Sequence, residues 1–463
     1  MNPPTTVTDT NGARHKVGRL LGEGGQGAVY EIEGGRCAVK ILSSRASSNT
    51  WSLSNQLHFL RQLSLDGIPI AKPIAVLKLP DVGYIMNLLS GMEPISELIT
   101  PAKSCISLRD WYLKTGGLKR RLRICAKAAD AIASLNARGL CYGDVSAANI
   151  FLSKSLASEE VCLIDADNLR FESTATNQPI YTPGFGAPEI VTGQGVNTTL
   201  SDAHAIAVLA FKTLSIVHPL IGDSVENGDP EIEEKAFAGQ LPWIDHPTDS
   251  SNRSSRGLSR ETTLSPGLKK LAETTFNEGL QSVIQRPTSR QWADAIDLAS
   301  RNCVLCSGCK NSFYVNLKNC PWCGIEVSKF IAVSFITWDP EMNQGRGDFL
   351  RNTNKKQSVT FRFLLSENEK FIITERMALG YPAEAGMGAI LTIEMKNGDL
   401  LFTRNQDACD IQVGSPKNWS MRNNLSFTMK IDDSLKEKQI RFGTDDKRVY
   451  RIMICQLEGG LRK

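Results

Sequence analysis

Asp144 and Asn149 lie five residues apart in the segment GLCYGDVSAANIFL, which ends in an apolar run. A third polar residue, Asp165, follows Asn149 by 16 positions at the end of the apolar segment VCLIDADN. A carboxylate placed like that of Asp144 could be a general base, a remnant of one, or an ordinary loop acid. The spacing alone does not separate these three interpretations, so the surrounding segments must decide.

A glycine-rich stretch near the N-terminus has the pattern of a phosphate-binding turn. The stretch VGRLLGEGGQGAVYEIEGGRCAVKIL contains Gly22, Gly24 and Gly27 in the order G-x-G-x-x-G, then Val29, Ala38 and Lys40. Dinucleotide-binding domains carry this pattern between a strand and a helix. Here both flanks are strand-like, so the pattern predicts a β-hairpin whose glycines let main-chain N–H groups approach phosphates.

Further motifs lie on either side of Asp144. Upstream, RRLRICAKAADAIASLNARG predicts a helix with one apolar face, ended by Gly139. Downstream come YTPGFGAPE, which contains Thr182 and Glu189, and then Ser201-Asp202 at the start of an apolar helix, and finally Arg286-Pro287. Each motif is weak by itself, and their order along the chain carries the information.

In that order the motifs resemble those of bacterial eukaryotic-type Ser/Thr protein kinases, over about residues 15–300. The resemblance implies an α+β, bilobal protein-kinase fold in a domain of residues 1–300, with an N-lobe of about 15–88 and a C-lobe of about 91–300. The implied reaction is transfer of the γ-phosphoryl group of ATP to protein hydroxyls, autophosphorylation included.

The resemblance also implies roles for individual residues. The glycines, Val29 and Ala38 bind ATP, and Lys40 holds its α- and β-phosphates. Asp144 is the catalytic base, while Asn149 and Asp165 bind Mg²⁺ or Mn²⁺. Ser146 and Thr182 belong to the substrate side, and Glu189, Asp202 and Arg286 are structural, with Glu189 paired to Arg286.

Four positions depart from the family pattern. Tyr142-Gly143 replaces His-Arg, Asp165-Ala166-Asp167 replaces D-F-G, Ser146 replaces Lys, and the predicted helix near 50–63 contains no carboxylate. These departures leave open an alternative function: a pseudokinase that binds nucleotide and recruits partners through the C-terminal part. Because Gly143 removes the Arg that reads loop phosphate, we expect activity without phosphorylation of Ser173, Thr174 and Thr176.

The missing carboxylate leaves Lys40 without its usual ion pair. No Asp or Glu occurs between Ile41 and Leu65, and Gln56 lies nearest to the vacant position. We therefore expect Asp165 to be the main acidic neighbour of Lys40, with Gln56 accepting a hydrogen bond from it.

Five of the 12 cysteines crowd into residues 303–323, which favours a metal site over disulfides. The pairs Cys306-x-x-Cys309 and Cys320-x-x-Cys323 have the spacing of a zinc ribbon, here residues 301–326, with a structural Zn²⁺. Cys303 forms an alternative pair with Cys306. We prefer the pair with Cys309, because Phe313 then follows as in many ribbons.

Residues 330–463 are rich in β-branched and aromatic residues and predict a β-sandwich of unknown role. Within them, Asn397-Gly398 predicts a tight hairpin turn. In the first domain, the Ser-rich segment 246–267 predicts an exposed loop between helices.

Charge and N-terminal composition bear on location and partners. The net charge of +4 is mild and gives no clear nucleic-acid signal. The N-terminal segment lacks the apolar core of a signal peptide, and no apolar run is long enough to span a bilayer, so we expect a cytoplasmic protein without membrane partners. The segment YTPGFGAPEI resembles kinase-like proteins that accompany von Willebrand-domain proteins and metal-dependent phosphatases, which suggests these as partners.

Overall fold

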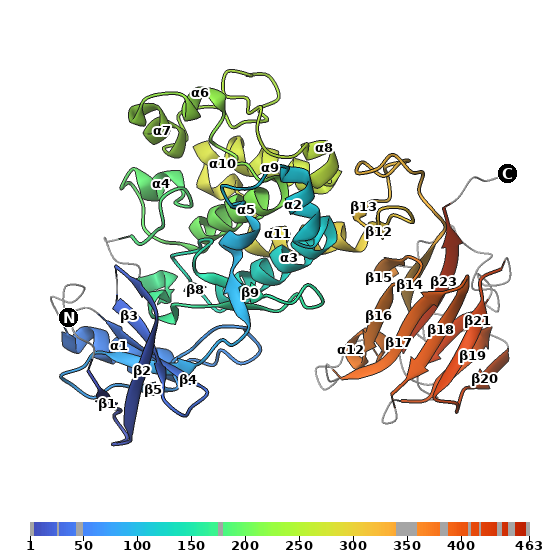
Figure 1. The fold of residues 1–463 in the computed structure, drawn as a ribbon, viewed down its shortest axis with the longest axis horizontal. Coiled ribbons are helices and arrows are strands. Elements are labelled where there is room, and N and C mark those ends of the chain that lie inside the picture. The colour runs from blue at the N-terminus through green and yellow to red at the C-terminus, as the bar shows by residue number, and fades with distance from the viewer. Residues whose placement is uncertain are drawn as a thin grey trace. The chain divides into compact units, whose positions relative to one another are not determined.

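The structure is a computed structural model. It describes residues 4–25, 27–42, 50–174, 179–338, 359–379, 388–405, 409–415, 418–432, 438–442 and 450–459. The chain forms two compact units, Met1–Ser300 and Arg301–Lys463 (Figure 1). The expected α+β content of the first and the β-rich character of the second are confirmed.

The first unit begins with a six-stranded antiparallel sheet in the order β1-β2-β3-β4-β6-β5. Its strands are β1 Thr6–Thr8, β2 Arg14–Gly24, β3 Gly27–Ile32, β4 Cys37–Leu42, β5 Ala75–Val76 and β6 Gly83–Asn87. The glycine-rich stretch forms the β2–β3 hairpin, in which Gly24 faces Gly27 and Gly22 faces Val29. Helix α1, Thr50–Gln62, follows β4 in the chain.

The third glycine of the hairpin is required by strand packing. A Cβ atom on Gly27 would lie 2.2 Å from the main-chain oxygen of Ile41 on β4, a distance that real Cβ atoms do not reach. The first two glycines have no atom within 4 Å of such a Cβ. Gly27 therefore lets β3 approach β4, and Gly22 and Gly24 leave open space above the hairpin.

The remainder of the first unit is mainly helical. Its longer helices are α2 Leu108–Lys114, α3 Gly117–Asn136, α5 Thr199–Ser215, α7 Pro230–Phe237, α9 Pro266–Phe276 and α11 Ser289–Arg301. Shorter helices are α4 Pro188–Val191, α6 Asp223–Glu226, α8 Arg260–Thr263 and α10 Glu278–Gln281. Helices α3 and α5 pack against each other, and the predicted apolar face of α3 is fully buried.

Five short strands also belong to the first unit, in one three-stranded and one two-stranded sheet. They are β7 Met92–Pro94, β8 Leu140–Cys141, β9 Ile150–Ser153, β10 Val161–Leu163 and β11 Arg170–Phe171. Strand β9 lies between β10 and β7, and β8 pairs with β11. The turn before β9 carries Asp144, and the turn after β10 carries Asp165, so antiparallel pairing brings both turns to the same end.

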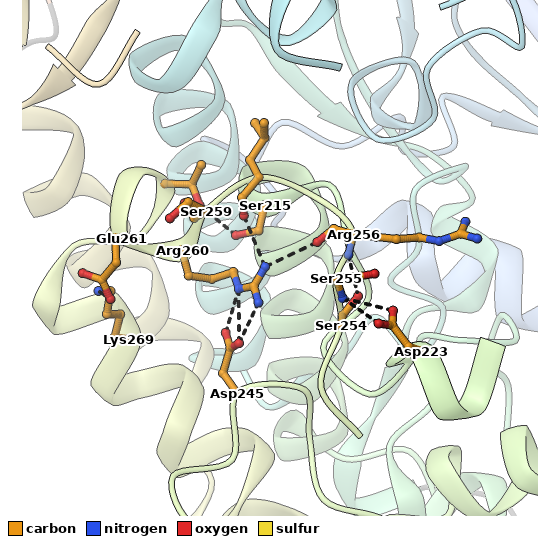
Figure 2. Close-up of polar contacts among 12 residues, drawn as sticks. Ser215, Asp223, Asp245, Ser254, Ser255, Arg256, Ser259, Arg260, Glu261 and Lys269 are labelled. Atoms are coloured by element: carbon orange, nitrogen blue, oxygen red, sulfur yellow. Dashed lines mark hydrogen bonds and ion pairs between the residues drawn. The ribbon is translucent and has the colours of Figure 1, made fainter. Parts of the chain in front are cut away.

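The Ser-rich segment 246–267 is more structured than the predicted loop. Figure 2 shows Arg260 of α8 bound to Asp245, with guanidinium–carboxylate distances of 2.8 and 2.9 Å, and the Ser255 N–H donating to Asp223. Asn252 is 2% exposed, and its amide bonds the main chain of Gly222 and Leu220. Side-chain bonds to neighbouring elements, together with the short helix α8, therefore fix this segment.

The second unit contains a small two-stranded element and two antiparallel sheets. The small element pairs β12 Cys303–Leu305 with β13 Ser312–Tyr314. The first sheet holds β15 Val359–Leu365, β14 Phe330–Trp338, β23 Tyr450–Glu458, β22 Gln439–Phe442, β19 Ile411–Ser415 and β20 Asn418–Met421. The second holds β16 Lys370–Thr374, β17 Ala389–Lys396, β18 Asp399–Arg404 and β21 Ser426–Lys430. Side chains of both sheets form one hydrophobic core.

The local predictions in the second unit can be checked strand by strand. Asn397 and Gly398 both have positive φ, at 53° and 77°, and they connect paired strands β17 and β18, so the predicted hairpin is confirmed. The composition of residues 330–463 predicts strands, but the end of the segment KFIITERM within them forms helix α12, Glu375–Leu379. Glu, Arg, Met, Ala and Leu are good helix formers, which explains the change. Within the described residues, no helix is both long and apolar enough to cross a membrane.

Candidate active site

The carboxylate of Asp144 is held by two side chains. Asn149 donates through Nδ2 to Asp144 Oδ2 at 2.8 Å, and Thr182 donates through Oγ1 to Asp144 Oδ1 at 2.7 Å. Because the amide nitrogen of Asn149 points to Asp144, its oxygen is the atom available to a metal. The sequence therefore named three residues that the fold brings together, although Thr182 lies 38 positions from Asp144.

Asp202 supports the loop that carries Asp144. Its carboxylate accepts the N–H groups of Tyr142 and Gly143 at 2.7 and 2.9 Å and the amide of Asn136 at 3.0 Å. Burial raises the pKa of Asp202 to about 6, and these hydrogen bonds act in the opposite direction. Gly143 has φ of 81°, a conformation that glycine adopts without strain.

Lys40 contacts two carboxylates, where one was expected. Its ammonium is 2.9 Å from Asp165 Oδ1, and 3.0 and 3.1 Å from the two oxygens of Asp167. Burial lowers the pKa of Lys40, but the charges of Asp167 and Asp165 more than offset this and raise it. The expectation that Asp165 is the main acidic neighbour of Lys40 was wrong, because Asp167 contributes two contacts.

Gln56 also has a different partner from the one expected. Its amide nitrogen donates to the main-chain oxygen of Asp167 at 3.0 Å instead of accepting a bond from Lys40. Tyr84, which faces Lys40 across the β4–β6 pairing, donates its hydroxyl to Asp167 Oδ1 at 2.8 Å. Sequence reasoning missed Asp167 and Tyr84 as site residues. The available signal was an Asp at the third position of the D-F-G equivalent, where the family has Gly.

Asp165 itself has a left-handed main chain, with φ of 55° and ψ of 50°. Such a conformation costs a non-glycine residue about 1 kcal/mol and is found often at functional sites. Burial raises the pKa of Asp165, and Lys40 opposes that shift. The side chain retains 22% exposure, so the carboxylate is still accessible to solvent or an ion.

The structure also locates the other residues expected to bind ATP or to face the substrate. Ala38 is buried on β4, and Val29 faces Lys40 in the β3–β4 pairing. Ser146 is 1% exposed, and its hydroxyl has no hydrogen-bond partner among the described residues. Thr182, which is half-buried and bound to Asp144, is therefore nearer to an incoming hydroxyl than Ser146 is.

Glu189 and Arg286 form a bidentate ion pair, in which the two guanidinium nitrogens lie 2.9 and 3.0 Å from the two carboxylate oxygens. The Arg286 side chain is fully buried and also donates to the main-chain oxygens of Gly279 and Leu200. The pair joins α4 to the loop before α11, and thereby fixes the segment that follows Thr182. Of the three possible phosphorylation positions, Thr176 lies outside the described residues.

The second unit contains a separate candidate metal site. The sulfur atoms of Cys306, Cys309, Cys320 and Cys323 all lie within 4.8 Å of one another, and Cys303 is not among them. Four thiolates about 2.3 Å from a zinc ion would be about 3.8 Å apart, so this donor set fits tetrahedral Zn²⁺. Cys303 instead pairs with Tyr314 inside the β12–β13 element.

Comparison with known proteins places the first unit. The protein kinase domain family matches residues 15–294, which is more than half of the chain. The chain belongs to the protein kinase family. The match covers the β2–β3 hairpin, Lys40, the Asp144 loop and the Glu189–Arg286 pair.

Relatives among curated proteins are bacterial kinases for the most part. The chain is 26% identical over 379 residues to protein kinase YegI of Escherichia coli O157:H7, covering 75% of this chain and 54% of the relative. It is 27% identical over 258 residues to serine/threonine-protein kinase pkn2 of Myxococcus xanthus, covering 52% and 28%. PknB of Mycolicibacterium smegmatis matches at 26% over 236 residues, or 48% and 35%. The chain thus spans about half of YegI and less of the others.

Proposed function

We propose that this chain is an ATP-dependent Ser/Thr protein kinase that phosphorylates protein hydroxyls, its own included. The observation that supports this most is the 2.7 Å hydrogen bond from the Thr182 hydroxyl to Asp144 Oδ1. The Thr182 hydroxyl, on the expected substrate side, already donates a hydrogen bond to the Asp144 carboxylate, which would accept the proton in the reaction. Hydrogen-bond contact between base and hydroxyl is the geometric requirement for this role.

Phosphoryl transfer depends mainly on positioning and on neutralising charge, and each residue has one such task. Asp144 accepts the proton of the substrate hydroxyl, and Asp202 keeps the Asp144 loop in place through two main-chain N–H groups. Lys40 neutralises charge on the α- and β-phosphates, beneath the β2–β3 hairpin. Asn149 and Asp165 offer amide and carboxylate oxygens, the ligands that Mg²⁺ prefers. A bound Mg²⁺–ATP would supply the transferable group and shield its charge.

A pseudokinase scaffold is the second candidate function. The buried hydroxyl of Ser146 favours it, because that position cannot supply the charge that the family's Lys brings to the substrate side. In this case the chain binds nucleotide, and the second unit recruits partners. We further propose that the Cys306–Cys323 group binds one structural Zn²⁺ per chain.

Location and partners belong to the same proposal. We propose a cytoplasmic location. From the resemblance of the segment YTPGFGAPEI we propose a von Willebrand-domain protein and a metal-dependent phosphatase as partners.

The deciding experiment measures transfer of labelled phosphate from ATP, with Mg²⁺ or Mn²⁺, to the protein and to a basic protein substrate. Wild type should transfer phosphate, and Asp144→Asn should lower the rate about 1,000-fold while retaining nucleotide binding, because the base is lost. Thr182→Val keeps the Asp144 carboxylate and removes the hydroxyl bound to it, so it measures what that hydrogen bond contributes to the rate. Nucleotide-dependent stabilisation without any transfer by wild type would select the scaffold function.

A further inference from the structure

Asp167 is the better enclosed of the two carboxylates on Lys40. Its side chain is 6% exposed, against 22% for that of Asp165, and Lys40 itself is 4% exposed. Both oxygens of Asp167 contact the Lys40 ammonium, at 3.0 and 3.1 Å, and Asp165 approaches it through Oδ1 at 2.9 Å. A buried ammonium needs a buried counter-charge with satisfied hydrogen bonds, and Asp167 meets this requirement.

Three elements fix the Asp167 carboxylate. Tyr84 on β6 donates to Oδ1, Lys40 on β4 contacts both oxygens, and Gln56 on α1 bonds the main-chain oxygen. The residue also lies in the 3₁₀ helix Ala166–Asn168, which holds its main chain. With its oxygens engaged by Lys40 and Tyr84, Asp167 has little capacity left for a hydrated ion. Asp165, whose side chain is more exposed, retains that capacity.

From this geometry we propose that Asp167 is the positioning residue that holds Lys40 in place for the phosphates of ATP, and that Asp165 is thereby free to bind metal. The inference rests on the proposed kinase function. It explains how α1 can lack a carboxylate: the counter-charge of Lys40 comes from the segment after β10 instead. Displacement of α1 would then break the bond from Gln56 to the Asp167 main chain but would leave the Lys40–Asp167 ion pair intact.

The first test measures Lys40 directly and does not need enzyme activity. The full chain, without nucleotide, is acylated with acetic anhydride over a range of pH, and modification of Lys40 is quantified by peptide mass spectrometry against exposed lysines. Asp167→Asn should raise the rate of Lys40 acylation at every pH of the range by about tenfold, because the lysine side chain loses the partner that holds it in its buried position. An equal rate of Lys40 acylation in Asp167→Asn and in wild type would overturn the inference.

The second test separates positioning from metal binding. Asp167→Asn should lower kcat/KM for ATP by about 100-fold, as expected for a misplaced phosphate-binding group. Adding Gln56→Glu to Asp167→Asn should restore at least tenfold of that loss, since residue 56 already reaches the Asp167 segment. Gln56→Glu alone is the matched control and should give no gain. Recovery of Asp167→Asn by raised Mn²⁺, without benefit from Gln56→Glu, would identify Asp167 as a metal ligand and overturn the inference.

The two proposals fail in different ways. A wild-type chain that transfers no phosphate overturns the kinase function, yet the Lys40 acylation profile still decides the role of Asp167 in holding Lys40. An active wild type whose kcat/KM is unchanged by Asp167→Asn overturns the role of Asp167 alone.

Discussion

The residues of the cysteine cluster are close together in the sequence, whereas those of the Lys40 site are far apart. The four clustered cysteines lie within residues 306–323, and two similar turns present all of them. Lys40 and its partner Asp167 are 127 positions apart, and Tyr84 and Gln56 join them from two further elements. Sequence spacing therefore located the first site and left only the choice between Cys303 and Cys309 open, while for the second it named Lys40 and Asp165 and missed Asp167.

The two sites also differ in what stabilises them. At the cysteine cluster, the proposed zinc ion would supply the counter-charge of the thiolates from outside the chain. At the Lys40 site the chain supplies every charge itself, and the two carboxylates share a single ammonium. Removal of metal should therefore destabilise the cysteine cluster. Loss of one charged partner should destabilise ion pairs between distant parts of the chain.

The largest effect is expected when the local site loses a ligand. Cys306→Ser removes one of the four proposed zinc ligands and should abolish zinc binding. The effect should be large, because structural zinc contributes about 10 kcal/mol to the folding of small modules of this kind. Metal analysis of purified protein should give one zinc per chain for wild type and none for the variant. Cys303→Ser is the matched control, since Cys303 is buried outside the cluster, and it should retain the metal. Zinc that persists in Cys306→Ser and disappears in Cys303→Ser would reverse the assignment.

A long-range pair should show the next largest effect. Arg286→Met leaves Glu189 without its partner and should reduce the free energy of unfolding by about 3–5 kcal/mol. Chemical denaturation followed by circular dichroism measures the loss. The double variant Arg286→Met/Glu189→Gln should recover part of it, because no uncompensated charge then remains. Equal losses in the single and double variants would show that Arg286 acts through its main-chain contacts instead.

A third prediction concerns pH and the buried helix α5. His204 is 1% exposed, and neither ring nitrogen has a hydrogen-bond partner among the described residues. Burial lowers the pKa of His204 well below its usual value, and Arg286 and His218 add to the shift. The unfolded chain then binds more protons below pH 6.5 than the folded chain does, so stability falls as pH falls.

This loss should amount to about 1 kcal/mol between pH 6.5 and 5.5. Asp202, whose pKa is raised to about 6, favours the folded state at lower pH and partly opposes the trend. Burial lowers the pKa of His218 to about 3, so that residue contributes to the same trend. His204→Leu isolates the contribution of His204 and should reduce, without abolishing, the pH dependence of unfolding relative to wild type. An identical slope in both proteins would contradict the prediction.

The smallest effect returns to the cysteine cluster. Each of its turns has a residue with positive φ after the second cysteine: Lys310 at 60° and Gly324 at 80°. Lys310→Gly should stabilise the metal-bound module by about 0.5–1 kcal/mol, because glycine adopts this conformation without strain. Gly324→Ala should destabilise it by a similar amount. The rate of zinc loss to a chelator measures both, and slower loss from Gly324→Ala would contradict the geometry.

Local chemistry let several features be predicted from the sequence. The flanks of G-x-G-x-x-G predicted a hairpin, Asn397-Gly398 predicted a turn with positive φ, and the Cys-x-x-Cys pairs predicted a cluster of four cysteines. The order of the kinase motifs indicated the family, and residues 15–294 belong to it. Each of these features depends on neighbours in the chain or on a fixed order of motifs.

Only the tertiary structure decided the partners of buried charges. Which carboxylate neutralises Lys40 depends on how β4, β6 and the turn after β10 pack together, and spacing carries no information about that packing. The same holds for Asn252, whose amide fixes a segment that the sequence predicted to be an exposed loop. A buried polar group must find a partner, but the fold determines which polar group lies within reach.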